Sequence, residues 1–222
     1  GCGKSTLLKM VAGLLDPTDG RLLLWRKPVD QLDASGRKIA FVFQAPTLMP
    51  WASVQANVRL PLDLAGVSRA EAEPRVAEAL ATVGLAKFAN ALPRALSGGM
   101  QMRVSIARGL VVQPQLLLMD EPFGALDEIT RHKLDADLLQ LWAEKKLTVV
   151  FVTHSIHEAV VLSTRVVMMA ARPGRIVEEC HIDEPYPRKP EFMVSPRFAD
   201  YASQLQRSLM RASETQGEET LT

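Results

Sequence analysis

The sequence has few cysteines, almost no net charge and no long apolar run, and each of these absences excludes or disfavours a class of protein. Its two cysteines, Cys2 and Cys180, form no disulfide framework, which favours a reducing compartment such as the cytosol. A net charge of +1 gives no strong basic field for nucleic acid or an anionic membrane surface. No apolar run of about 18 residues predicts a transmembrane helix, and no charged segment followed by an apolar one predicts a secretory signal. With 222 residues, 47% of them hydrophobic, the chain is long enough for one globular domain, either alone or with a subdomain.

Strand and helix patterns alternate near both ends of the chain but not in its middle. Apolar runs predict strands at residues 22–25, 39–43, 116–119, 148–153, 165–170 and 175–178. Helical periodicity, helix caps and capping boxes predict helices at residues 7–15, 68–83, 97–110 and 128–145, from residue 155, and at 196–211. The runs at 116–119 and 148–153 are typical of strands buried on both faces. The pattern predicts a parallel α/β core interrupted by a helical insertion between Gln44 and Pro114.

Residues 1–6 read GCGKST and match the second half of the phosphate-binding P-loop motif, G-x-x-x-x-G-K-[ST]. In that motif backbone N–H groups surround the phosphates, Lys4 neutralises β- and γ-phosphate charge, and the Ser5 hydroxyl binds Mg²⁺. The helix that begins here adds its positive N-terminal end. Taken alone, the same residues could also form a glycine-rich turn with a surface lysine.

Residues 116–121 read LLLMDE. Four apolar residues bury the strand and bring Asp120 and Glu121 to its carboxyl end, where ligands bind in open α/β sheets. Asp120 is the candidate ligand of Mg²⁺, directly or through water, and Glu121 is the candidate base that polarises an attacking water. The alternative is a strand that ends in a solvated acidic turn.

Residues 96–101 read LSGGMQ at the start of a predicted helix. Ser97, Gly98 and Gly99 can present unobstructed backbone N–H groups to an anion. The structural alternative is a serine cap with a glycine-rich entry to the helix. This segment lies far along the chain from Lys4, so two phosphate-binding segments require either that the fold brings them together or that two copies combine.

Together these motifs resemble the ABC-type ATPases across essentially the whole chain. Gln44, at the end of its strand, matches the Q-loop glutamine, and Asp127, in the segment GALD, matches the D-loop. His154, directly after an apolar strand, matches the switch histidine. The family's signature motif, which binds the ATP of a partner subunit, corresponds to Ser97, Gly98, Gly99 and Gln101.

The resemblance implies one ABC ATPase domain over residues 1–222, with an α/β P-loop NTPase (RecA-like) core and an inserted ABC helical subdomain. The core would comprise residues 1–44 and 114–179, the helical subdomain 45–113, and a C-terminal tail 180–222. The family pattern also has a glycine and two further residues before the position of Gly1, preceded by strands and an adenine-stacking aromatic residue. We therefore expect the sequence to begin inside the P-loop.

ATP and Mg²⁺ are the cofactors that the resemblance implies. Catalysis is expected at Glu121, the general base, and at His154, which orients the γ-phosphate and the water. Mg²⁺ is expected at Ser5, Gln44 and Asp120. The expected ATP-binding residues are Gly1, Cys2, Gly3, Lys4, Ser5, Thr6 and Gln44.

Within the family, the chain looks closest to the nitrate, sulfonate and taurine importer ATPases. The residues that carry this likeness are 48–51 (LMPW), 54–58 (VQANV), 120–127 (DEPFGALD) and 171–176 (ARPGRI). It implies hydrolysis of ATP to drive uptake of a small solute, from a peripheral position on the cytoplasmic face of the membrane. The expected partners are a second copy in a homodimer, an integral membrane permease contacted by residues 46–51, and indirectly a solute-binding protein, but no nucleic acid.

Two other classes of function fit the sequence less well. A soluble ABC-type ATPase that remodels nucleic acid or ribosomes would carry long charged insertions, a coiled-coil arm or tandem cassettes. The 222 residues and net charge of +1 show none of these. An inactive interaction module would not need Lys4, Glu121 and His154, and all three are present.

Overall fold

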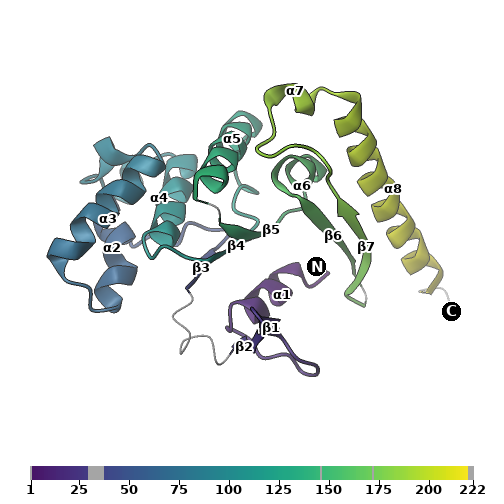
Figure 1. Ribbon diagram of the computed structural model, residues 1–222, viewed down its shortest axis with the longest axis horizontal. Coiled ribbons are helices and arrows are strands. Elements are labelled where there is room, and N and C mark those ends of the chain that lie inside the picture. The colour runs from purple at the N-terminus through teal and green to yellow at the C-terminus, as the bar shows by residue number, and fades with distance from the viewer. Residues whose placement is uncertain (1, 30–37, 146, 172, 220–222) are drawn as a thin grey trace. The chain divides into compact units, whose positions relative to one another are not determined.

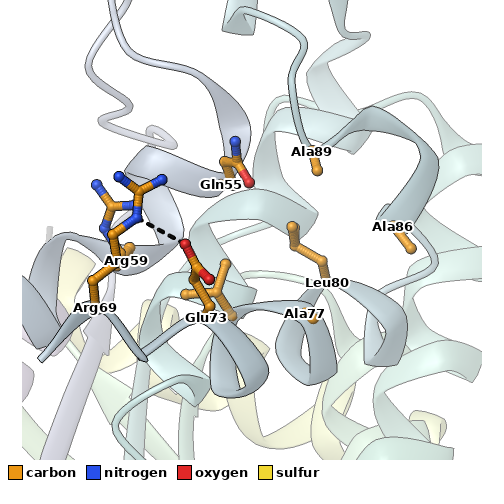
Figure 2. Close-up of a pocket in the computed structure, with 9 residues that line it drawn as sticks. Gln55, Arg59, Arg69, Glu73, Ala77, Leu80, Ala86 and Ala89 are labelled. Carbon is orange, nitrogen blue, oxygen red and sulfur yellow. Dashed lines mark hydrogen bonds and ion pairs between the residues drawn. The ribbon is translucent and has the colours of Figure 1, made fainter. Parts of the chain in front are cut away.

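The computed structural model describes residues 2–29, 38–145, 147–171 and 173–219 (Figure 1). The chain forms two compact units, one of Leu8–Val152 and the other of Gly1–Leu7 with Thr153–Thr222. Helix α1 (Lys4–Val11) begins in the second of these and continues into the first. These boundaries differ from the predicted division into core, helical subdomain and tail, which stays a prediction.

The Leu8–Val152 unit holds most of the secondary structure. After α1 its elements are β1 (Leu23–Leu24), β2 (Lys27–Pro28), β3 (Ile39–Val42), α2 (Val54–Leu64), α3 (Arg69–Thr82), the short 3₁₀ helices η3 (Ala86–Phe88) and η4 (Pro93–Ala95), α4 (Gly98–Leu110), β4 (Leu116–Asp120), α5 (Glu128–Lys145) and β5 (Thr148–Val152). Each helix or strand predicted over these residues is present, with boundaries shifted by a few residues.

Strands β3, β4 and β5 form a parallel sheet in that order. Ile39 lies opposite Leu116 in one ladder, and Leu116 lies opposite Thr148 in the next. All five residues of β4 are buried, as its apolar run predicts. The prediction that residues 148–153 are buried on both faces is wrong, because Val150 is 40% exposed. Among the described residues β5 pairs only with β4, so it is an edge strand with fewer covering neighbours.

Helices α2, α3 and α4 pack together around an apolar core (Figure 1). The core includes Val54 and Val58 of α2, Ala72 of α3 and Val104 of α4, none of which is exposed to solvent. All three helices lie between Gln44 and Pro114, where the sequence predicts a helical insertion. A separate core lies against the sheet, where Leu8 of α1 clusters with residues of β4 and β5.

Serine residues cap five of the helices that the structure describes, because each hydroxyl accepts a hydrogen bond from a backbone N–H that the first helical turn leaves unpaired. These residues are Ser53, Ser68, Ser97, Ser155 and Ser195. Each bond joins the serine Oγ to the N–H three residues later, at 3.2 Å for Ser195, 3.3 Å for Ser53, Ser97 and Ser155, and 3.4 Å for Ser68. The helix starts predicted at residues 68, 97 and 155 are therefore confirmed.

In the unit that contains Thr153–Thr222, α6 (Ile156–Leu162) precedes a hairpin of β6 (Arg165–Ala170) and β7 (Arg175–His181). The hairpin is antiparallel, with Ala170 opposite Arg175, which corrects the expectation that these strands extend the parallel core. Residues 171–174 are too few for the crossover that a parallel pair requires.

The C-terminal part of this unit is helical. After α7 (Pro190–Met193), helix α8 (Pro196–Glu219) is longer than the predicted helix, which ends at Arg211. Figure 1 shows α8 alongside the hairpin, where Glu178 of β7 accepts hydrogen bonds from Gln204 and Ser208. Leu205 of α8 is buried in the same core as Val160 of α6. Within the described ranges, no helix is both long and apolar enough to cross a membrane.

Candidate functional site

The residues of the P-loop motif lie at the start of α1. Gly3 has a φ of +90°, and a Cβ built there would meet no atom within 4 Å. The Leu7 N–H donates to the Gly3 carbonyl at 2.9 Å, which is a helical hydrogen bond. The backbone N–H groups that precede Leu7 therefore belong to the first turn, whose N–H groups have no acceptor within the helix itself. Lys4 Nζ lies 3.5 Å from Cys2 Sγ, and Thr6 is exposed. Open space beside a glycine at a helix N-terminus suits the close approach of a phosphate. Gly1 lies outside the described residues.

Three of the predicted site residues, Gln44, Asp120 and Glu121, lie at the carboxyl ends of two neighbouring parallel strands. Gln44 is exposed two residues after β3, and Asp120 is the last residue of β4, where it is only 9% exposed. The carboxyl ends of parallel strands meet at one edge of a sheet, so the structure brings these three residues to the same edge.

Glu121 adopts an unusual backbone conformation. Its φ is +44°, in the left-handed region that residues other than glycine seldom occupy. Its N–H donates to the Val152 carbonyl at 2.9 Å, and its own carbonyl accepts from the Gly124 N–H at 3.1 Å. Neighbouring backbone therefore holds the conformation in place and turns the chain sharply at the end of β4, as is often found at functional sites.

The predicted signature residues surround the N-terminus of α4. Ser97 and Gly98 are exposed, whereas Gly99 is buried against α5. The Gln101 side chain folds back and donates to the carbonyls of Pro93 and Leu96, at 3.1 and 3.3 Å. Ser97 and Gly98 therefore lie at the surface at this end of α4.

Replacing Gly99 by alanine is expected to lower the free energy of unfolding by about 1–3 kcal/mol, the usual cost of overpacking. The new Cβ would lie 2.7 Å from Thr130 Cγ2, and a β-branched side chain has few other rotamers to adopt. Urea denaturation measures the change.

Gly98→Ala is the matched control, because its Cβ would meet only Leu126, at 3.6 Å, and it reports helix propensity alone. Adding Thr130→Ser, which removes Cγ2, should restore most of the stability of Gly99→Ala. A Gly99→Ala protein as stable as Gly98→Ala would show that α4 and α5 are not in close contact at this point.

Asp127, the predicted D-loop residue, caps α5. Its Oδ1 accepts a hydrogen bond from the Thr130 N–H at 2.9 Å. This bond is the main reason that the pKa of Asp127 lies below its ordinary value. Capping α5 is a structural reason for an aspartate at position 127. The role of Asp127 in the D-loop is a separate proposal.

His154 lies between β5 and α6, and it is exposed. The turn around it is fixed by Thr153, whose hydroxyl donates to the buried carboxylate of Glu158 and accepts from the Ser155 N–H at 2.9 Å. The sequence pattern identifies Ser155 and Glu158 only as a capping box. The structure shows that Glu158 also fixes Thr153, the residue directly before His154.

The predicted site residues are divided between the two units. Gln44, Asp120 and Glu121, together with the α4 residues, belong to Leu8–Val152, whereas residues 1–7 and His154 belong to the other unit. One neighbour of the P-loop, Gly174 in the β6–β7 turn, is not among the residues predicted from the sequence. A Cβ at Gly174 would lie 2.7 Å from the Cys2 carbonyl oxygen, so only glycine fits this close approach. The glycine of the segment ARPGRI was the feature of the sequence that could have indicated this close approach.

A buried parallel strand that ends in two carboxylates, together with a lysine after a left-handed glycine at a helix N-terminus, is typical of P-loop nucleotide-binding proteins. The comparisons with known proteins agree, since residues 1–124 match the family described as ABC transporter. The chain belongs to this family and is an ABC-type ATPase. The predicted fold class, a P-loop α/β core with an ABC helical insertion, is confirmed by the similar structures that follow.

The chain is 49% identical over 183 residues to the taurine import ATP-binding protein TauB of Rhizobium johnstonii, covering 82% of this chain and 69% of that protein. Its structure is similar to a dimeric post-hydrolysis state of an ATP-binding cassette bound to ADP and Pi, with a TM-score of 0.70, 35% identity and 82% coverage of each chain. It is also similar to cbiO1 from Clostridium perfringens, part of the ABC transporter complex cbiONQ. That TM-score is 0.74, with 27% identity over 92% of this chain and 83% of the other.

Proposed function

We propose that this chain is the ATP-hydrolysing subunit of an importer for a small solute of the taurine, sulfonate or nitrate type. The observation that carries the ATPase mechanism is the pair Asp120 and Glu121 at the carboxyl end of the buried strand β4. The likeness to a taurine import ATP-binding protein supports the class of solute.

ATP binding is assigned to the P-loop and to Gln44. The open space beside Gly3 leaves room for phosphate, and Lys4 neutralises phosphate charge. Mg²⁺, which balances the charge of the phosphates when bound, prefers oxygen ligands, and the chain offers the Ser5 hydroxyl, the Gln44 amide oxygen and the Asp120 carboxylate. The other residues assigned to the nucleotide are Gly1, Cys2 and Thr6.

Hydrolysis is assigned to Glu121 and His154. The Glu121 carboxylate accepts a proton from the attacking water, and the His154 imidazole orients that water and the γ-phosphate. The backbone bonds around Glu121 and the Thr153–Glu158 hydrogen bond beside His154 would hold both groups in place.

A second copy of the chain is proposed to complete the site. Ser97 and Gly98 are exposed at the N-terminus of α4, where backbone N–H groups and the helix dipole favour an anion. In a head-to-tail homodimer they would contact the γ-phosphate of the ATP bound by the partner's P-loop, with Gly99, Gln101 and Asp127 supporting the same interface. The similar cassette bound to ADP and Pi is dimeric, which supports this arrangement.

A membrane permease is the second proposed partner. We assign the contact to residues 46–51, hereafter the contact segment, in which Trp51 is 78% exposed. A large exposed aromatic residue is a typical anchor of a protein interface. Through the permease the subunit would act at the cytoplasmic face of the membrane, and a solute-binding protein would deliver the cargo.

The test is uptake by proteoliposomes that contain the permease, its solute-binding protein and the full-length chain. ATP-dependent uptake of taurine, an alkanesulfonate or nitrate is expected, and Lys4→Ala should abolish it because the phosphate charge is no longer neutralised. Lys9→Ala is the matched control, since Lys9 is exposed on the same helix and precedes its end by two residues. Uptake that is equal with and without ATP would refute the proposed function, and uptake of an unrelated solute alone would refute the solute class.

A further inference from the structure

Arg108, near the C-terminal end of α4, holds the beginning of the contact segment. Its Nη1 donates to the Thr47 carbonyl at 2.9 Å, and its Nη2 donates to the Pro46 carbonyl at 2.9 Å and to Thr47 Oγ1 at 2.8 Å. A planar guanidinium can make all these bonds at once, whereas a lysine ammonium cannot reproduce their geometry. The bonds join residues 61 and 62 positions apart in the sequence.

Thr47 is held in a conformation that its side chain disfavours. Its φ is +47°, and a β-branched residue is a genuine outlier in the left-handed region. Such a conformation persists only where the surroundings determine it, and the Arg108 bonds to the carbonyl and hydroxyl of Thr47 do so. Burial lowers the pKa of the Arg108 guanidinium below its ordinary value, because desolvation disfavours the charged form.

The other end of the contact segment is held by Asn57 of α2. This side chain is completely buried, and its Oδ1 accepts from the Met49 N–H at 2.7 Å. Its Nδ2 lies 3.1 Å from each of the carbonyls of Met49, Ala52 and Ser53. These bonds hold the backbone on both sides of Trp51 in the sequence, and the Trp51 side chain itself is exposed. The segment therefore presents its largest side chain from a fixed backbone.

Helix α4 is also packed firmly against the elements on either side of the segment. Ala107 shares a core with Val58 of α2, the helix that follows the segment. Gly109 lies close to the sheet, because a Cβ there would be in ordinary contact, at 3.6 Å, with Val42 of β3, the strand that precedes the segment. The segment is therefore connected to α4 through Arg108 itself and through both neighbouring elements.

We infer that Arg108 is a positioning residue that couples the contact segment to α4, so that movement of this helix is passed to Trp51. This inference rests on the proposed function, in which Ser97 and Gly98 at the other end of α4 contact the partner's ATP. One helix would then report the state of the nucleotide to the permease. Arg108 acts through the segment and contacts neither ATP nor solute.

The experiment compares the reconstituted transporter carrying Arg108→Gln with the wild type. The ratio of solute-stimulated to unstimulated ATPase activity, and the number of solute molecules transported per ATP, should each fall by about 2- to 30-fold, the range for loss of one coupling contact. Arg103→Gln is the matched control on the same helix, because Arg103 bonds the Val83 carbonyl and Asp137 rather than the segment. This control should lower thermal stability without changing either ratio.

Thr47→Gly gives a second test if Arg108→Gln does not fold. Glycine accepts a φ of +47° without strain and removes the Oγ1 acceptor, so the protein should fold while the segment is less constrained. Both ratios should again fall, and combining it with Arg108→Gln, where that protein folds, should add little. Unchanged ratios in Thr47→Gly or Arg108→Gln, in a transporter whose wild type shows ATP-driven uptake, would overturn this inference alone. Absence of ATP-driven uptake in the wild type would overturn the proposed function instead.

Discussion

Replacing Glu121 by glutamine is expected to lower the rate of ATP hydrolysis by about 10²–10⁴-fold while ATP binding persists, because the change removes only the proton-accepting group. The amide has nearly the same shape as the carboxylate, so the side chain can keep its place. The backbone bonds from the Glu121 N–H to Val152 and from Gly124 to the Glu121 carbonyl are unaffected by the substitution. The left-handed turn at the end of β4 should therefore be retained.

The measurement is single-turnover hydrolysis of ATP, with nucleotide affinity determined separately by calorimetry. Glu128→Gln is the matched control, because Glu128 is an exposed carboxylate in the first turn of α5. It should hydrolyse ATP at nearly the wild-type rate. Turnover by Glu121→Gln within a few-fold of the control would remove Glu121 from the role of general base.

Replacing Gly98 by aspartate is expected to abolish ATP-dependent dimerisation while each monomer still binds ATP through its own P-loop. The loss should be at least about 10²-fold in dimer affinity, because like charges brought together at an interface cost several kcal/mol. Gly98 is exposed, and a Cβ there would meet only Leu126 Cδ2, at 3.6 Å, which is an ordinary contact. An acidic residue in the first turn of a helix is favourable in the monomer, so the fold should not suffer.

Sizing chromatography of the Glu121→Gln protein with ATP and Mg²⁺ provides the assay, because slow hydrolysis preserves the dimer. Gly98→Asn in the same background separates bulk from charge, since asparagine has almost the shape of aspartate and no negative charge. We expect the asparagine protein to retain part of the dimerisation and the aspartate protein none. A stable dimer of the aspartate protein would show that the N-terminus of α4 does not face the partner's phosphate.

The sequence by itself determined which residues form helices and strands, because helix caps and apolar runs act through residues close together in the chain. Ser68, Ser97 and Ser155 start helices because a hydroxyl satisfies an N–H that the helix cannot. The run at residues 116–119 is a central strand because four consecutive apolar side chains require cover on both faces. The family motifs identified the candidate site residues for a related reason, since phosphate and Mg²⁺ chemistry needs particular groups at particular spacings.

The tertiary structure decided which of these residues are accessible and what supports them. Gly98 and Gly99 are adjacent and chemically identical, yet one is exposed and the other faces Thr130, because successive positions on a helix point in different directions. The bonds of Arg108 to Thr47 join distant positions, and the packing of α4 against its neighbours sets such a contact. Periodicity and motif spacing describe only near neighbours along the chain, so contacts of this kind are visible only once the chain is folded.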